Sequence, residues 1–101
     1  MNNALSLLQK WYAQHCDEDW EHSYGVKIDT LDNPGWMLTV DLADTEFCDV
    51  LLPRNRLDRS EADWIQSEIS GRRYIACGGV FNLEEMIFDF LIFVGEVSSS
   101  A

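Results

Sequence analysis

The sequence predicts an α+β domain: an antiparallel sheet of four or five strands flanked by an N-terminal and a C-terminal helix, both packed on one face. Apolar residues recur with helical spacing near each end of the chain, and two central pairs of segments alternate apolar with polar residues around turn residues. A chain of 101 residues is the size of one domain. We expect that domain to span residues 1–97, followed by a disordered tail at 98–101.

Residues 3–15 predict the first helix. Its apolar side chains follow the i, i+3, i+4, i+7 spacing of one helix face. They are Ala4, Leu5, Leu8, Trp11 and Tyr12. We expect the helix to end in the acidic cluster 17–19, because carboxylates near a helix C-terminus oppose its dipole.

Residues 24–31 and 36–42 predict the first hairpin. Val26 and Ile28 alternate with charged neighbours, and WMLTVDL alternates in the same way. The intervening DNPG supplies a proline that presets φ and a glycine that accepts a positive φ. We assign DNPGW to folding, because turn chemistry explains it and Trp36 begins the inward-facing row of its strand.

The middle of the chain is less regular. DVLLP predicts a short extended piece that Pro53 ends. The basic cluster RNRLDR at 54–59 holds three of the seven positive charges. It is interpreted as a solvated loop, with a salt-bridge role as the alternative. Residues 63–69 and 73–77 then predict a second hairpin around the turn SGR.

Residues 82–94 predict the last helix. Asn82 is placed to cap it, with Glu85 three positions on as in a capping box. The apolar stripe is core rather than a cofactor site, and its members are Leu83, Met86, Ile87, Phe90, Leu91 and Val94.

The face of the sheet away from the helices is expected to be acidic with a few large side chains, as protein-binding surfaces are. Its predicted members are Lys27, Asp29, Met37, Thr39, Asp41, Trp64, Gln66 and Glu68.

Charge is the strongest compositional signal. Eighteen acidic against seven basic residues give a net charge of −11, which disfavours nucleic-acid binding and favours a basic protein partner. No apolar run reaches the ~20 residues that cross a bilayer, and no signal peptide is evident, so we expect a cytoplasmic protein without membrane contact. Cys16, Cys48 and Cys77 form no C-x-x-C pair and are interpreted as reduced thiols.

The stretch CDEDWEHSYG at 16–25 has the composition of a metal or catalytic site. Its spacing does not fit an EF-hand, because the sixth position from Asp17 is His22 rather than glycine. No second Cys or His cluster completes a zinc site. Cys48 and Arg54 match the C-x5-R spacing of thiol phosphatases, but the intervening DVLLP has no glycine to form a phosphate cradle. We therefore expect no metal, no cofactor and no catalytic residue.

Three segments carry a resemblance to a known family. LLQKWYAQHCDEDWEHSYGVKIDTLDNPGW, SEADWIQSEI and GGVFNLEEM resemble the immunity protein 53 family of bacterial polymorphic toxin systems, over about residues 5–94. The resemblance implies a small cytoplasmic, non-enzymatic antidote that binds and neutralises the toxin domain encoded beside it. Toxin chemistry and contact residues do not come with this resemblance.

A basic toxin would meet carboxylates and aromatic anchors on such a protein. We predict that residues 17–24 form part of the toxin-facing surface, with Trp20, His22 and Tyr24 open to a second interpretation as core or hydrogen-bonded residues. The predicted partner-binding residues are Asp17, Asp19, Trp20, Glu21, His22, Tyr24, Asp29, Asp41, Trp64 and Glu68.

Two alternatives from other classes stay open at this point. The first is a small metal- or thiol-dependent enzyme centred on Cys16 and His22, with the acidic residues between them. The second is an acidic nucleic-acid mimic that inhibits a nuclease. The oligomeric state, the identity of the toxin and the manner of its inhibition do not follow from the sequence.

Overall fold

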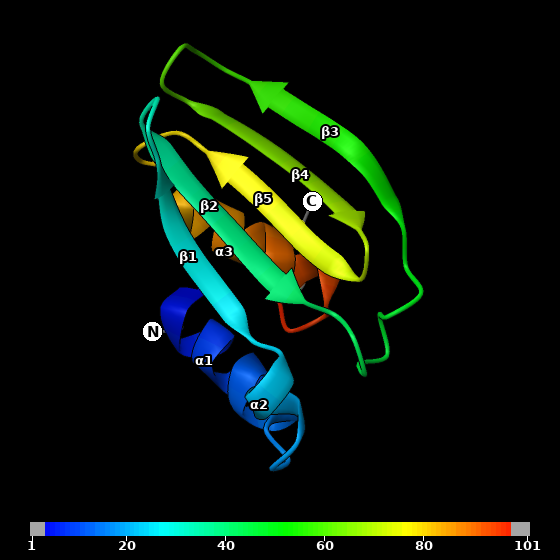
Figure 1. Ribbon diagram of the computed structural model, residues 1–101. Helices are drawn as coiled ribbons and strands as arrows, with labels where there is room; N and C mark the ends of the chain where they lie inside the picture. Colours follow the sequence, from blue (N-terminus) through cyan, green and yellow to red (C-terminus); the bar gives the residue numbers. More distant parts are fainter. Residues whose placement is uncertain (1–3, 98–101) are drawn as a thin grey trace.

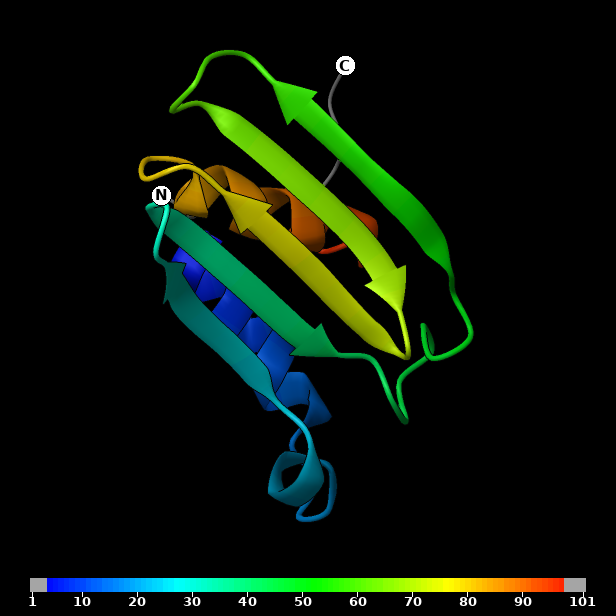
Figure 2. The same ribbon diagram turned by 45° about the horizontal axis from the view of Figure 1, so that its top comes forward.

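A computed structural model of the chain describes residues 4–97 and shows an α+β fold, as predicted. The two long helices, near the two ends of the chain, lie on one face of a five-stranded antiparallel sheet (Figures 1 and 2). The strand order of the sheet is β1-β2-β5-β4-β3. The elements are α1 (Ala4–His15), α2 (Trp20–Ser23), β1 (Val26–Leu31), β2 (Gly35–Asp41), β3 (Leu52–Asp58), β4 (Trp64–Ser70), β5 (Arg73–Gly78) and α3 (Leu83–Phe93). The predicted tail at 98–101 lies outside the described residues.

Both predicted hairpins are confirmed. β1 pairs with β2 in a regular register from Val26 opposite Val40 to Leu31 opposite Gly35. β4 and β5 pair across a turn in which Gly71 and Arg72 both have positive φ, as a two-residue hairpin loop requires.

The core lies between the helices and the inner face of the sheet. Trp11 of α1 meets Phe90 of α3 edge to face, with ring centroids 5.0 Å apart, and Phe90 also contacts Tyr74 of β5. Leu38 and Val40 on β2 are fully buried beneath them, as the alternation of their strand predicts. These contacts fix the helices on the sheet.

Residues 54–58 form a strand rather than the predicted loop, and only Arg59 lies beyond its end. Leu52–Asp58 forms β3 at the edge of the sheet, with Pro53 inside it and a register shift between Leu52 and Asn55. An edge strand tolerates proline because one side of its backbone has no partner strand. All but the first of its residues are exposed, so no alternation of apolar and polar residues marks this strand in the sequence.

The start of α3 also differs from the prediction. Asn82 precedes the helix, but its side chain makes no capping bond and no capping box forms with Glu85. Its amide instead faces β4, where Oδ1 accepts a hydrogen bond from the Trp64 N–H at 3.4 Å. A tertiary partner has therefore displaced the local capping interaction.

Candidate functional site

Two segments that are distant in the sequence meet at one end of the sheet. The first runs from the end of α1 through α2 (residues 17–24) and the second is the β2–β3 loop (residues 43–49); together we call them the acidic end (Figure 1). The Trp20 indole N–H donates to the Ala43 carbonyl at 2.9 Å and joins the two segments. The carboxylates of the acidic end are Asp17, Glu18, Asp19, Glu21, Asp44, Glu46 and Asp49.

Two of these carboxylates shape the backbone. Asp17 Oδ1 accepts the N–H groups of Trp20 at 2.8 Å and Asp19 at 3.0 Å, and so satisfies donors at the start of α2. Glu21 reaches back, and its two oxygens accept the N–H groups of Asp17 and Glu18, each at 2.9 Å. The bonds from Trp20 and Asp19 lower the pKa of the Asp17 carboxyl. The pKa of the Glu21 carboxyl is lowered by its own backbone N–H and by those of Asp17 and Glu18.

Two others occupy a backbone conformation that side chains disfavour. Glu18 has φ 77° and Asp44 has φ 59°, both in the left-handed region. The side chains of Asp19 and Asp44 are exposed, and within residues 4–97 neither forms an ion pair or a side-chain hydrogen bond. Their full negative charge therefore faces solvent.

The acidic end surrounds an open depression of about 590 Å³. Its lining residues are Gln14, His15, Asp17, Asp19, Trp20, His22, Ser23, Tyr24 and Asp44. Asp44 has no place in the predicted set, because nothing in its local sequence indicates that the loop folds back beside 17–24.

The aromatic residues of the depression divide between the two interpretations left open by the sequence. Trp20 is only 4 % exposed and contacts Trp11 and Tyr24, so its indole belongs to the core. Tyr24 is half-buried against that core, whereas His22 is exposed. His15 donates from Nδ1 to the Trp11 carbonyl at 2.9 Å and thereby closes the end of α1.

The outer face of the sheet is not the acidic surface that the sequence predicts. Because 54–58 is a strand, its arginines lie beside the carboxylates of neighbouring strands: Arg54 pairs with Glu68 at 3.2 Å. The Arg56 guanidinium carbon lies 4.4 Å from the centroid of the Trp64 ring, and Trp64 is 9 % exposed. At the other side of the face Asp41 pairs with Arg73 at 3.2 Å and also accepts the Gly25 N–H.

Asp29 is the one predicted contact residue of this face that is exposed and, among residues 4–97, has no ion pair. The predicted set therefore splits in space. Residues 17–24 come together around the depression, whereas Asp29, Asp41, Trp64 and Glu68 are spread over the outer face.

The residues of the alternative enzyme site do not converge. Cys16 Sγ donates to the Tyr12 carbonyl at 3.3 Å, and Cys16 does not line the depression into which His22 faces. Within residues 4–97, no three His, Cys, Asp or Glu side chains are grouped so as to hold a metal ion. Burial raises the pKa of the Cys77 thiol, which disfavours the reactive thiolate.

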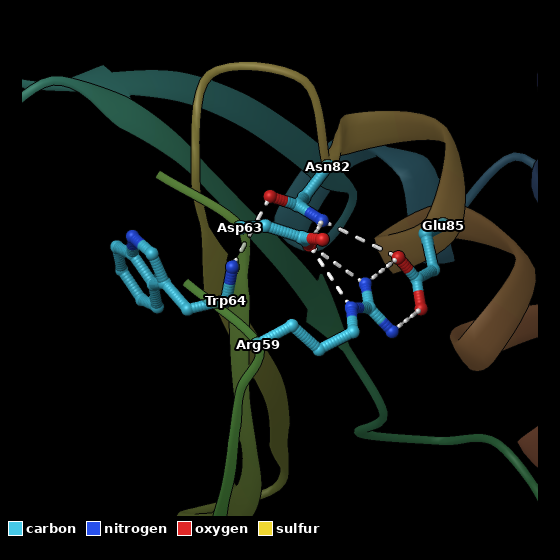
Figure 3. A network of polar contacts seen from close by, with 5 residues as sticks. All are labelled: Arg59, Asp63, Trp64, Asn82 and Glu85. Carbon is cyan, nitrogen blue, oxygen red and sulfur yellow. Dashed lines mark hydrogen bonds and ion pairs between the residues drawn. The ribbon is translucent and has the colours of Figure 1, made fainter. Parts of the chain in front are cut away.

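The opposite end of the sheet holds a closed polar network (Figure 3). Arg59 Nη2 donates to Asp63 at 2.9 Å and Nη1 to Glu85 at 3.0 Å, while the Asn82 amide donates to Asp63 at 2.9 Å. The guanidinium holds the pKa of both carboxyls below their usual range. We call Arg59, Asp63, Asn82 and Glu85 the arginine network.

Comparison with known families gives a match that covers most of the chain. Residues 5–95 match the model of the family described as Immunity protein 53. The chain belongs to the Immunity protein 53 family. Immunity proteins of this kind have a toxin-neutralising role, so a toxin is the partner that the family implies. Searches of curated proteins and of solved structures gave no match.

The segments that carry the resemblance to Immunity protein 53 lie in two different environments, one packed against backbone and one beside the depression. A Cβ on Gly35 of DNPGW would lie 2.3 Å from the Gly78 carbonyl oxygen, and one on Gly79 would lie 2.1 Å from that of Ala62. These glycines permit close backbone packing next to the arginine network. DWEHSYG, in contrast, forms α2 and borders the depression.

No helix within residues 4–97 of this Immunity protein 53 member has the length and apolar character needed to span a membrane.

Proposed function

We propose that the protein neutralises its cognate toxin by stoichiometric binding without catalysis, and that the acidic end is the surface the toxin contacts. One observation carries the proposal. Exposed carboxylates from two distant segments gather around one depression, while Asp41 and Glu68 of the outer face are each ion-paired to arginine. Of the predicted outer-face carboxylates, Asp29 alone keeps an unpaired charge within residues 4–97, and it stands apart from the depression.

The chemistry of the acidic end indicates a basic contact surface on the toxin. Unpaired carboxylates steer a basic partner and speed its encounter. The buried Trp20 indole and the backbone bonds of Asp17 and Glu21 hold the carboxylates in place before the partner arrives, which lowers the ordering cost of binding. Exposed His22 and half-buried Tyr24 supply polar and aromatic contact area beside them.

The test replaces charge without disturbing the backbone. The double variant Asp19→Asn/Asp44→Asn removes two carboxylates that make no side-chain bond to the described residues 4–97, and asparagine tolerates the positive φ of Asp44. Affinity for the toxin domain encoded beside the gene is measured by titration calorimetry at two salt concentrations. We expect about tenfold weaker binding and a smaller salt dependence.

A matched control makes the same change of charge elsewhere. Glu61→Gln/Glu84→Gln also removes two exposed carboxylates, both near the arginine network. Unchanged affinity in this control with loss in the test variant supports the proposal. Equal affinities in both variants would place the toxin contact on another surface.

A further inference from the structure

The two edges of the sheet are built differently. β3 carries Pro53, a register shift and charged side chains, which are features that protect an edge from pairing with another strand. β1 has no proline and pairs with β2 without a shift along its whole length, from Val26 to Leu31. Figures 1 and 2 show its other side open, with no strand beside it. β1 is therefore the edge able to accept a strand.

The backbone groups available on β1 follow from its pairing with β2. The Gly25 carbonyl accepts the Asp41 N–H at 3.0 Å, and in an antiparallel ladder every second residue bonds to the same neighbour. The N–H and C=O groups of Val26, Ile28 and Thr30 consequently point away from the sheet. A strand that pairs with β1 must bond to these three residues.

We propose that the strand is β1 of a second copy, paired antiparallel with Ile28 opposite Ile28. In this register Val26 lies opposite Thr30 of the second copy, and each pair exchanges both N–H···O bonds. Lys27 lies opposite Asp29 of the second copy, and Asp29 opposite its Lys27, on the outer face of the sheet. The strand is complementary to itself.

Charge selects this register over its neighbours. A shift by two residues keeps the hydrogen bonds but places Lys27 opposite Lys27, or Asp29 opposite Asp29, and like charges directly opposite are destabilising. Both side chains are exposed, and within residues 4–97 neither has an ion pair in its own chain. Each finds its partner only in the second copy.

The inner side of the same edge is apolar. Ile28 is 38 % exposed and Leu5 on α1 is 56 % exposed, and both line a small groove with Leu83 and Ile87 of α3. Pairing at β1 brings Ile28 of the second copy to this groove and covers apolar surface there. The antiparallel arrangement places the two acidic ends toward opposite ends of the joint, so each remains open to a toxin.

The first measurement is sedimentation velocity of the full chain from about 1 to about 300 μM, because small interfaces bind in the micromolar range. We expect a monomer–dimer equilibrium. Lys27→Asp and Asp29→Lys should each weaken it about tenfold, while the double variant Lys27→Asp/Asp29→Lys restores the opposite charges and the dimer. Circular dichroism verifies that each variant is folded.

A second variant tests the backbone bonds directly. Thr30→Pro removes an N–H that points away from β2, so the fold should be kept and the dimer lost. Hydrogen exchange adds a residue-level readout: the amides of Val26 and Ile28 should exchange slowly in the dimer and fast in Thr30→Pro, which has no amide proton of its own at position 30.

Three results would overturn the proposal. They are a monomer at every concentration, a dimer that Lys27→Asp and Thr30→Pro leave unchanged, and a charge-swapped double variant that fails to dimerise. A monomer whose β1 amides become protected when toxin is added would assign this edge to the toxin instead. The toxin-binding titration uses other residues, so either proposal can fail alone.

Discussion

Carboxylates gather at both ends of the sheet, but they have different partners. In the arginine network, Asp63 and Glu85 face one guanidinium and the buried amide of Asn82. At the acidic end, the bonds of the Asp17 and Glu21 carboxylates within residues 4–97 go to backbone N–H groups. In the same part of the chain, Asp19 and Asp44 form no side-chain hydrogen bond or ion pair. Carboxylates thus form ion pairs that link chain segments at one end of the sheet, and expose their charge to solvent at the other.

Under the proposed function, the difference separates a folding role at one end from a binding role at the other. A carboxylate whose charge is neutralised by arginine contributes little to the field felt by a partner, whereas one bonded to backbone N–H groups keeps its net charge. We therefore expect changes in the arginine network to affect stability alone. Changes at the acidic end should affect toxin affinity, with or without an effect on stability.

The largest effect is expected from Asn82→Ala. Asn82 is 5 % exposed and its amide links β4, Asp63 and Glu85. Loss of the amide leaves the buried Trp64 N–H without a partner and should lower the free energy of unfolding by about 2–3 kcal/mol. Urea denaturation measures this, and Glu84→Ala, an exposed change on the same helix turn, should alter stability by less than about 0.5 kcal/mol. Weaker toxin binding by folded Asn82→Ala would contradict the separation of the two ends.

Arg59→Met should reduce the dependence of stability on pH. The guanidinium lowers the folded-state pKa of Asp63 and Glu85, so their contribution is present above the unfolded values near 4 and is lost as the pH falls through the folded values. In the variant the folded-state pKa values of both carboxyls rise toward the unfolded ones, with only the Asn82 amide left to lower them, so this loss becomes smaller. Urea denaturation at neutral and acidic pH measures the change, with Lys10→Met as the control.

Part of the dependence of stability on acidic pH should persist in Arg59→Met. Asp17 and Glu21 keep their lowered pKa values, because backbone N–H groups rather than Arg59 cause them. A variant with no remaining dependence of stability on acidic pH would show that the acidic end contributes nothing to folding.

Asp17→Ala should have a smaller effect on stability. It removes the oxygen that accepts the N–H groups of Asp19 and Trp20, and loss of such a cap should lower Tm by a few degrees. Asp17→Asn keeps an oxygen for the same bonds and should retain most of the stability. Both lose the charge, so equal reductions in toxin affinity would identify charge, and a reduction in Asp17→Ala alone would identify the shape of the turn.

The sequence predicted the elements whose signals are local. The apolar spacing of 3–15 gave the α1 helix, and the alternation of 36–42 gave β2 with its buried Leu38 and Val40. β3 was missed because an edge strand exposed on both faces has no alternation, and its proline indicated a break.

The grouping of residues at the candidate site could be predicted only in part, for the same reason. Residues 17–24 are contiguous, and their composition alone marked them as unusual. The position of Asp44 beside them depends on the fold of a separate loop, and the pairing of Glu68 depends on a strand that the sequence did not reveal. The motif around Asn82 matched a helix cap, but buried partners outcompeted that local bond.

The smallest effect tests whether the conformation of the acidic end serves binding or folding. Glu18 has φ 77°, where glycine has no steric penalty, so Glu18→Gly should be more stable than Glu18→Ala by about 0.5–1 kcal/mol. Both variants lack the carboxylate, and only their backbone preferences differ. If the strained turn is kept to present charge, both should bind the toxin equally and more weakly than the unmodified protein. Weaker binding by Glu18→Gly than by Glu18→Ala would instead show that a rigid turn contributes to affinity, because only the glycine loosens it.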